Sequence, residues 1–227
     1  AAIAITNLSH VYDGAPHGAT VTTVPEGLVV DTTYNGSAAL QVAIGTYAVT
    51  GTVNDAIYGG TTTATFTITR MVQTVTFPDP GPQWMTNRVG LAATASSGLP
   101  VAFSVASGPG SIAGGTNLTF TGAGAVSVVA AQAGDADWLS AAATNAIAVT
   151  KAGATVTLGS LSPTYDGAAK SATATTVPAG LVVDFTYDGS GTAPTAAGSY
   201  IVTGTVNEAM YQGTNVGTLV IAKGAAT

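Results

Sequence analysis

The chain has 227 residues, of which 46% are hydrophobic, 7% are aromatic and only 7% are charged, and its formal net charge is −6. This acidic balance, with a sequence pI near 4.4, argues against the basic surface that binds nucleic acids or anionic membranes. The chain has no cysteine, which favours an exported bacterial protein over a disulfide-bonded animal one. No apolar run is long enough to span a bilayer, so we expect no membrane insertion.

An internal repeat organises the chain. Residues 12–60 align without a gap with residues 165–213, at the offset that separates Tyr12 from Tyr165. Roughly half of the aligned positions are identical, and self-similarity at a fixed offset is typical of tandem domains. We therefore predict three domains, at residues 1–71, 72–152 and 153–227, of which the third repeats the first.

The first domain is predicted to consist of strands alone. Alternating apolar and polar residues indicate strands at 1–8, 19–23, 28–34, 45–54 and 61–69. Asn35-Gly36 is a strong hairpin-turn signal. Two strands should bury one face each, the first with Tyr47, Val49, Gly51 and Val53, and the second with Ala64, Phe66 and Ile68. No segment has the 3.6-residue period of a helix.

The middle domain has shorter strands of the same kind. They are expected around Val75 and Phe77 and at 101–105, 117–122, 125–131 and 147–150. An irregular edge, without central strand pairing, is expected at Pro78, Pro80 and Pro82. Short strands separated by Gly and Pro turns predict a β-sandwich. The predicted fold class is all-β, with three tandem Ig-like β-sandwich domains in an elongated rod.

Two family resemblances follow from motifs that cover nearly the whole chain. Both outer domains carry Tyr-Asp-Gly, Thr-Thr-Val-Pro-x-Gly-Leu-Val-Val, Gly-x-Tyr-x-Val-Thr and Asn-x-Ala-x-Tyr-x-Gly, and they resemble the MBG domain of large bacterial extracellular proteins. The middle domain resembles bacterial Ig-like repeats, on the motifs at 73–77, 95–101 and 132–138. Residues 40–43 and Trp138 depart from these patterns. The resemblance implies a secreted or cell-surface repeat protein without catalytic activity.

The residues themselves also argue against an enzyme. The two histidines, His10 and His17, become Pro163 and Lys170 in the second copy, so the shared design does not need them. There is no cysteine nucleophile, serine nucleophile elbow or phosphate-binding loop. Two acidic positions recur, as Asp31 and Asp184 and as Asp55 and Glu208, and acidic pairs could serve glycoside hydrolysis. Their strand-end and turn contexts favour carboxylates that bind backbone amides. We expect no catalytic residues and no cofactor.

Calcium is the metal that the acidic turns could hold, because hard cations bind several convergent oxygens. The candidate ligands are Asp135, Asp137, Asn54, Asp55, Asn207 and Glu208. None of them forms an Asp-x-Asp-x-Asp-Gly loop, and ordinary turn chemistry is the favoured alternative. A row of threonines at 61, 63, 65, 67 and 69 could bind ice or glycan, but the second copy does not repeat it. A solvated strand face explains this row more simply.

Aromatic residues provide the candidate contact sites. Four tyrosines recur in both copies and are expected in the core: Tyr12, Tyr34, Tyr47 and Tyr58, matching Tyr165, Tyr187, Tyr200 and Tyr211. Tyr47→Ala or Tyr200→Ala should therefore cost about 3–5 kcal/mol. Trp84 and Trp138 have no equivalent in the outer domains. Trp84 lies in a Pro-rich loop and is the best candidate for contact with a sugar or a neighbouring chain.

Three of the five basic residues follow closing strands: Arg70, Lys151 and Lys223. Each could pair with a carboxylate on the next domain, such as Asp79 or Asp166, and orient the two domains. Exposed pairs of this kind contribute under about 1 kcal/mol. The alternative role is protection of strand ends against pairing.

Two functional hypotheses remain, and they belong to different classes. The chain is either a rigid stalk or fibre subunit on the outside of a bacterium, or an adhesin module whose loops bind a glycan or a host protein. The first is favoured because the copies share turn and core residues. Residues 223–227 resemble the joint at 151–155, so we expect either self-association into a fibre or continuation into further repeats. The start without Met suggests a processed product or a piece of a longer array.

Overall fold

A computed structural model describes residues 1–225, and these residues form strands, turns and loops. The prediction of an all-β chain is confirmed, because no helix occurs within the described range. It follows that residues 1–225 offer no helix long and apolar enough to cross a membrane.

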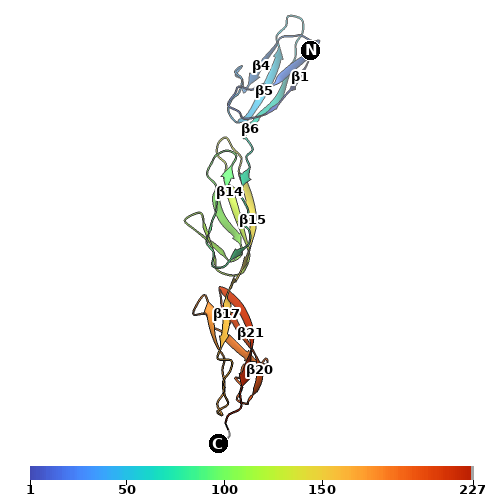
Figure 1. The fold of residues 1–227 in the computed structure, drawn as a ribbon. Coiled ribbons are helices and arrows are strands. Elements are labelled where there is room, and N and C mark those ends of the chain that lie inside the picture. Colours follow the sequence, from blue (N-terminus) through green and yellow to red (C-terminus); the bar gives the residue numbers. More distant parts are fainter. Residues whose placement is uncertain (226–227) are drawn as a thin grey trace. The chain divides into compact units, whose positions relative to one another are not determined.

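The first copy of the repeat forms a two-layered sandwich (Figure 1). Its strands are β1 (Ala2–Thr6), β2 (Ser9–Val11), β3 (Thr20–Val24), β4 (Val30–Tyr34), β5 (Gly45–Val53) and β6 (Thr61–Thr69). One sheet pairs β1 with β3, and the other has the order β2-β6-β5-β4. The core consists of Tyr34, Val49, Phe66 and Ile68, with Ile5 of β1 packed against it.

The expected faces of the two long strands are confirmed. Val49, Gly51 and Val53 of β5 are buried and Tyr47 is half-buried, while Phe66 and Ile68 of β6 are buried. Because successive side chains on a strand alternate between faces, the intervening threonines point outward. The hairpin signal forms a tight turn, with φ values of 47° at Asn35 and 86° at Gly36. However, the turn does not join β4 directly to β5, which begins only at Gly45.

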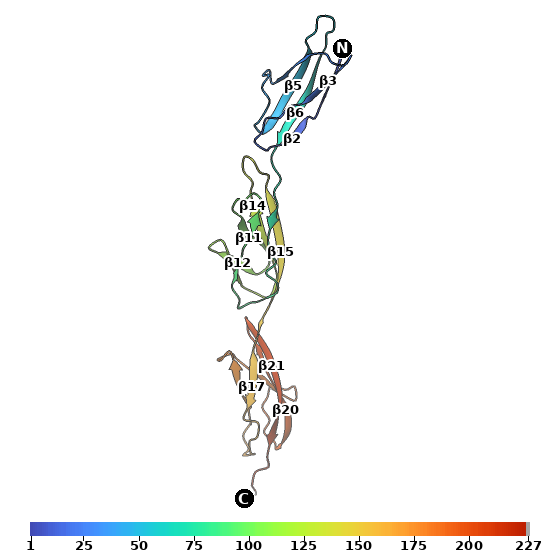
Figure 2. The same cartoon turned by 45° about the horizontal axis from the view of Figure 1, so that its top comes forward.

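Strand β2 was not expected from the sequence, and it has an unusual partner. It runs parallel to β6, with Ser9 opposite Thr67, His10 opposite Ile68 and Val11 opposite Thr69 (Figure 2). A parallel pair joins segments distant in sequence, so the start of the first copy is hydrogen-bonded to its end. A three-residue strand carries too little alternation to be recognised by pattern alone.

The stretch between the copies contains nine strands. They are β7 (Val75–Thr76), β8 (Gln83–Trp84), β9 (Val89–Gly90), β10 (Thr94–Ala95), β11 (Ala102–Ser107), β12 (Gly110–Ala113), β13 (Asn117–Phe120), β14 (Gly124–Gln132) and β15 (Ala141–Thr150). The sheet orders are β11-β14-β15-β8, β12-β13-β9 and β10-β7. Strand β8 follows the prolines and lies at a sheet edge. Strand β15 extends well before its predicted start at residue 147, and the short strands β8, β9, β10 and β12 were not predicted.

The second copy repeats the arrangement of the first. Its strands are β16 (Ala152–Gly153), β17 (Thr155–Gly159), β18 (Thr173–Val177), β19 (Asp184–Tyr187), β20 (Gly198–Asn207) and β21 (Tyr211–Ile221). Strands β17 and β18 form one sheet, as β1 and β3 do, and the other has the order β16-β21-β20-β19. Strand β16 pairs with the start of β21 and has no counterpart in the first copy, whereas the position of β2 is represented by a single parallel bridge between Thr164 and Ala222. The core residues Tyr187, Val202, Leu219 and Ile221 correspond to Tyr34, Val49, Phe66 and Ile68 of the first copy.

The chain divides into two compact units. One contains residues 1–76, 93–102 and 130–143, and the other contains the remaining residues from 77 onward. Each unit therefore combines one copy of the repeat with part of the middle stretch. The division into three domains remains a prediction.

Candidate functional site

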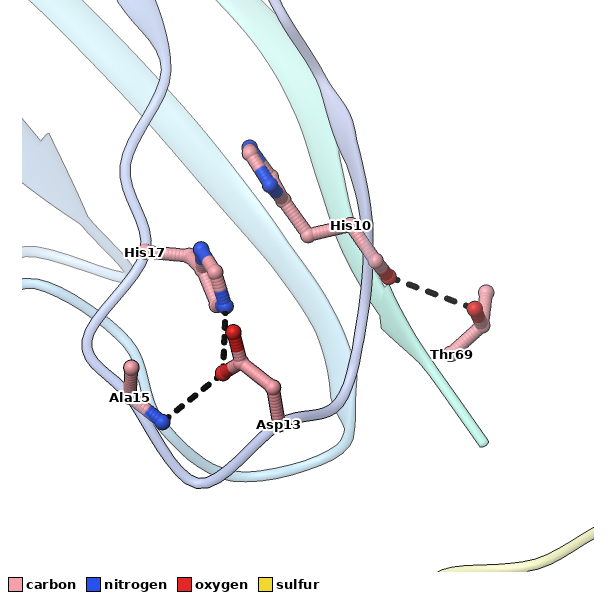
Figure 3. Close-up of polar contacts among 5 residues, drawn as sticks. All are labelled: His10, Asp13, Ala15, His17 and Thr69. Carbon is pink, nitrogen blue, oxygen red and sulfur yellow. Dashed lines mark hydrogen bonds and ion pairs between the residues drawn. The ribbon is translucent and has the colours of Figure 1, made fainter. Parts of the chain in front are cut away.

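A cluster of polar side chains lies at the start of the first copy, and we call His10, Asp13 and His17 the histidine cluster (Figure 3). His10 lies on β2, whereas Asp13 and His17 lie in the loop that follows. The two imidazole rings are stacked, with centroids 4.4 Å apart and planes inclined by 20°. The Nε2–H of His17 donates to Asp13 Oδ1 at 2.8 Å, and the backbone N–H of Ala15 donates to the same oxygen at 2.8 Å.

The two hydrogen bonds favour the ionised form of the Asp13 carboxyl. They lower the pKa of the Asp13 carboxyl, with the Ala15 N–H as the larger cause and the His17 bond next. This carboxyl therefore remains ionised well into the acid range.

The two rings differ in their partners. His10 Nε2 is buried and has no hydrogen-bond partner within residues 1–225. Its ring lies 5.5 Å from the ring of Phe66, centroid to centroid. His17, by contrast, has the carboxylate of Asp13 as its partner.

The second copy keeps the carboxylate and changes the bases. Lys170 Nζ lies 2.6 Å from Asp166 Oδ2, at the positions of His17 and Asp13. Here the pKa of Asp166 is lowered first by Lys170 and then by the N–H of Ala168. Pro163 replaces His10. The histidines do not recur, which is why sequence reasoning did not select them. Both copies have an Asp followed four residues later by a basic residue, Asp13 and His17 or Asp166 and Lys170. This shared spacing could have identified the pair from the sequence.

The geometry of the histidine cluster does not fit metal binding. One carboxylate and two stacked rings do not converge on a point, and no group of three His, Asp or Glu side chains within residues 1–225 could hold a metal ion. The histidine cluster is therefore best described as a hydrogen-bonded and stacked group of side chains at the ladder of β2 and β6.

The candidate calcium ligands are engaged in turns and do not come together. Asp135 Oδ1 accepts from the backbone N–H groups of Asp137 and Trp138 at 2.9 and 2.8 Å. Asp55 Oδ1 accepts in the same way from Ile57 and Tyr58 at 2.8 and 2.9 Å.

The remaining acidic candidates have similar partners. Asn54 Nδ2 donates to Asp31 Oδ2 at 3.0 Å, and Glu208 Oε1 accepts from the Val182 N–H at 2.6 Å. These hydrogen bonds in turns and at strand ends agree with the interpretation that the acidic side chains bind nearby amides rather than calcium.

The two tryptophans have different environments. Trp84 on β8 is 58% exposed. Beside it, Asn87 Nδ2 donates to Gln83 Oε1 at 2.9 Å, and Gln83 Nε2 donates to the carbonyl of Pro80 at 2.8 Å. These side-chain amides thus form hydrogen bonds within the loop. Trp138 is half-buried in the turn closed by Asp135.

The expected pairing of the three basic residues at strand ends with carboxylates of the next domain remains a prediction. Lys151 Nζ donates to Asn207 Oδ1 at 2.7 Å. In the described part of the chain, Asp13 is hydrogen-bonded to His17, and Asp166 forms an ion pair with Lys170. Asp166, which the sequence offered as a partner for Lys151, is paired with Lys170. Arg70 and Lys223 are exposed. Residues 226 and 227 of the predicted C-terminal joint lie outside the described residues.

The recurring tyrosines do not all belong to the core. Tyr34 and Tyr187 are buried, whereas Tyr47 and Tyr200 are half-buried. Tyr58 and Tyr165 are 42% and 46% exposed, which corrects the expectation that every recurring tyrosine faces inward. Both exposed rings lie outside long strands, where alternation does not fix a face.

The threonine row lies on the outer face of β6. Thr61, Thr63, Thr65 and Thr69 are exposed and Thr67 is half-buried, and Thr61 is opposite Thr52 of β5. In the second copy Val216 and Val220 stand at the positions of Thr63 and Thr67 and are exposed as well. A solvated face that tolerates either residue type fits both copies.

Both copies are thus β-sandwiches of the same kind. In each, recurring polar side chains form hydrogen bonds with backbone groups of the same copy. The MBG domain family matches residues 1–72 and 154–225, which is more than half of the chain. The chain belongs to the MBG domain family, with two copies that flank a middle stretch. A comparison with curated proteins finds no match.

Several solved structures resemble the chain at low identity. Drosophila N-cadherin EC1-3 has 11% identity and a TM-score of 0.30, and the match covers 95% of this chain and 98% of that one. The four N-terminal Ig domains of Dscam1 isoform 9.44 have 10% identity and a TM-score of 0.31, with coverages of 98% and 72%. Domains 1–6 of surface layer protein SbsC have 13% identity and a TM-score of 0.30; this chain is covered fully and spans 40% of that one. The family assignment rests on the sequence match alone.

Proposed function

We propose that this chain is a non-enzymatic structural segment of a bacterial extracellular or cell-surface protein, and that it serves as a stalk or fibre subunit that withstands tension. The first support is what the two copies share. The side-chain hydrogen bonds that they have in common, such as those of the Tyr34 and Tyr187 hydroxyls, join a side chain to the backbone of the same copy. A binding or catalytic role would instead retain groups directed at a ligand.

The observation that carries the proposal is the parallel ladder at the ends of each copy. In the first copy, the N–H of Tyr12 donates to the carbonyl of Thr69 at 2.9 Å and the N–H of Thr67 donates to that of Leu8 at 2.8 Å. In the second copy, Tyr165 donates to Ala222 and Val220 donates to Leu161, both at 2.9 Å. The early and late segments of each copy are thus tied by equivalent bonds.

This topology determines how a pulling force acts. When a copy is pulled by its two ends, parallel early and late strands must slide past each other. Their hydrogen bonds then share the load, whereas strands that are peeled apart break their bonds one at a time. The survival of a domain under force depends on its unfolding rate. A segment built in this way is suited to transmit tension along a stalk.

Force spectroscopy on single full-length chains tests this role. Because the chain lacks cysteine, thiol attachment at introduced cysteines is unique. In one variant the handles are attached at the chain ends. In the second, Asp31→Cys and Thr52→Cys provide the handles, because these exposed residues are partners on β4 and β5. We expect the first copy to unfold at a higher force in the first geometry than in the second. Equal forces would reject the mechanical role.

The proposed location has its own test. Antibodies raised against residues 1–227 should label intact cells of the organism that makes the protein, without permeabilisation. Labelling that requires permeabilisation would reject the extracellular assignment.

A second candidate function is adhesion through Trp84. An exposed indole beside the polar residues Gln83, Asn87 and Thr150 resembles a sugar-stacking surface. A glycan array with the full chain, compared with Trp84→Ala, distinguishes this candidate. A hit that the substitution abolishes would support adhesion, and the absence of any hit would leave the structural role alone.

Assembly is part of the stalk proposal. Contact between the last copy of one chain and the first copy of the next would not close on itself and would form a fibre. Light scattering of the chain with and without residues 223–227 tests this contact. A strictly monomeric full-length chain at high concentration would exclude assembly through that segment.

A further inference from the structure

We propose that Asn35 is a site of covalent modification, at which hydrolysis of the side-chain amide converts the asparagine into an aspartate without the help of an enzyme. The site is the turn of residues 34–37, which we call the Asn35 turn. Residues 187–190 form the corresponding Asp188 turn, in which the second copy already has the aspartate. This modification does not depend on the proposed stalk role.

The two turns have the same backbone. The φ values of the two central residues are 47° and 86° in the Asn35 turn and 49° and 83° in the Asp188 turn. In the Asn35 turn, the N–H of Tyr34 donates to the carbonyl of Ser37 at 2.6 Å, and the N–H of Ser37 donates to the carbonyl of Tyr34 at 3.0 Å. The equivalent bonds close the Asp188 turn at 2.7 and 2.9 Å. A glycine and a serine follow the asparagine or aspartate in both.

The side chains of Asn35 and Asp188 also make the same hydrogen bond. Asn35 Oδ1 accepts from the backbone N–H of Ala48 at 2.8 Å, and Asp188 Oδ1 accepts from that of Ile201 at 2.8 Å. This bond uses the oxygen that both side chains have, and not the Nδ2 group that the reaction removes. A carboxylate accepts such a bond more strongly than a neutral amide does. The second copy therefore shows how the first copy would accommodate the product.

The glycine after Asn35 makes the reaction possible. The backbone nitrogen of Gly36 loses its proton and bonds to Cγ of Asn35, the Cγ–Nδ2 bond breaks, and ammonia leaves with that proton. Water then opens the resulting succinimide ring. Attack on the former side-chain carbonyl gives aspartate, and attack on the main-chain carbonyl gives isoaspartate. Gly36 has no side chain to hinder the approach, the space around it is open, and both residues are exposed to water.

The other asparagines lack this combination, because each precedes a residue with a side chain. The pairs are Asn7-Leu8, Asn54-Asp55, Asn87-Arg88, Asn117-Leu118, Asn145-Ala146, Asn207-Glu208 and Asn215-Val216. In the Asn35 turn, the side chain must leave the N–H of Ala48 to reach the Gly36 nitrogen, so the reaction proceeds from a local opening of the turn. Exposed turns open at a lower free energy than core strands do. The fold thus slows the reaction without blocking it.

Peptide mapping by mass spectrometry tests the proposal on the full chain, sampled over time at mildly alkaline pH. The peptide that contains Asn35 should gain aspartate and isoaspartate before any peptide that contains another asparagine. A parallel sample unfolded in urea measures how far the folded turn slows the reaction. An Asn35 that stays intact in the folded chain, or another asparagine that reacts as fast, would overturn the proposal.

Two variants test the role of the turn. Asp188→Asn gives the second copy the same Asn-Gly-Ser sequence in the same backbone, so position 188 should then react at a rate similar to that of position 35. No reaction at position 188 would show that the turn does not determine the site. Asn35→Asp is the reference for the product. In hydrogen exchange followed by NMR, it should keep the Ala48 amide as protected as that of Ile201. Loss of this protection would show that the first copy does not accept the aspartate.

Discussion

The backbone N–H of Ala19 donates a hydrogen bond to the hydroxyl oxygen of Tyr34 at 2.7 Å, and Ala172 and Tyr187 make the same bond in the second copy at 2.8 Å. Tyr34 and Tyr187 are only 3% and 5% exposed. Each ring therefore fills the core of its sandwich while its hydroxyl holds the residue before the next strand. This dual use explains why tyrosine, and not phenylalanine, stands at this place in both copies.

Removal of that hydroxyl should destabilise the first copy. Tyr34→Phe leaves the N–H of Ala19 without its acceptor and should cost about 1–3 kcal/mol, and Tyr34→Ala should cost about 3–5 kcal/mol because it also empties a core site. Urea unfolding, followed by NMR signals of the first copy, measures both. The control is Tyr47→Phe, whose more exposed hydroxyl bonds to the Ala43 carbonyl and should matter less. An equal cost for both Phe variants would contradict this account.

A buried network of polar side chains is a second point of sensitivity. Gln132 Oε1 accepts from the side-chain amide of Gln73 and from the N–H of Gly134. Gln73 also donates to the carbonyl of Leu139 at 2.6 Å and accepts from Ser97 Oγ at 2.5 Å. Gln132→Leu leaves two donors unpaired and should cost about 2–4 kcal/mol.

The double variant Gln73→Leu with Gln132→Leu tests whether the two glutamines act together. Residues in one network show coupling of about 0.5–3 kcal/mol, so the double change should cost less than the two single changes summed. Strictly additive costs in thermal unfolding would mean that the bond between the two amides contributes little.

Gly108 should tolerate no side chain. Its φ is +91°, and a Cβ there would lie 2.1 Å from the carbonyl oxygen of Ala125. Gly108→Ala combines backbone strain with a clash against main chain and should cost about 3 kcal/mol or more. Gly98 has a φ of +75° but open space around it, so Gly98→Ala should cost only about 1–2 kcal/mol. Equal melting temperatures for the two variants would refute the predicted clash.

The carboxyl of Asp166 should titrate with a pKa below its ordinary value of 3.8. Lys170→Met should raise this pKa towards 3.8 but leave it lower, because the Ala168 N–H bond remains. A lowered pKa in the folded chain stabilises above pH 3.8, and this contribution is lost as the pH falls through the folded value. Carboxyl-carbon NMR titration measures the shift. The pKa of Asp55, which is lowered by the Ile57 and Tyr58 N–H groups, should not respond to Lys170→Met.

The sequence was a good guide wherever one strand carries several alternations. The buried faces of β5 and β6 followed from period-two patterning, and the family followed from motifs shared by the two copies. It was a poor guide for short strands and for aromatic residues in loops, such as Tyr58, where no periodicity relates position to burial.

By itself, then, the sequence determined the all-β class, the repeat and the long-strand cores, because alternation and self-similarity are local properties of the chain. Only the tertiary structure decided which distant segments meet. The parallel pairing of β2 with β6 and the stacking of His10 on His17 could not be read from sequence patterns. Spacing gives the face of a side chain within a strand, but the neighbour across the ladder depends on how the chain closes on itself.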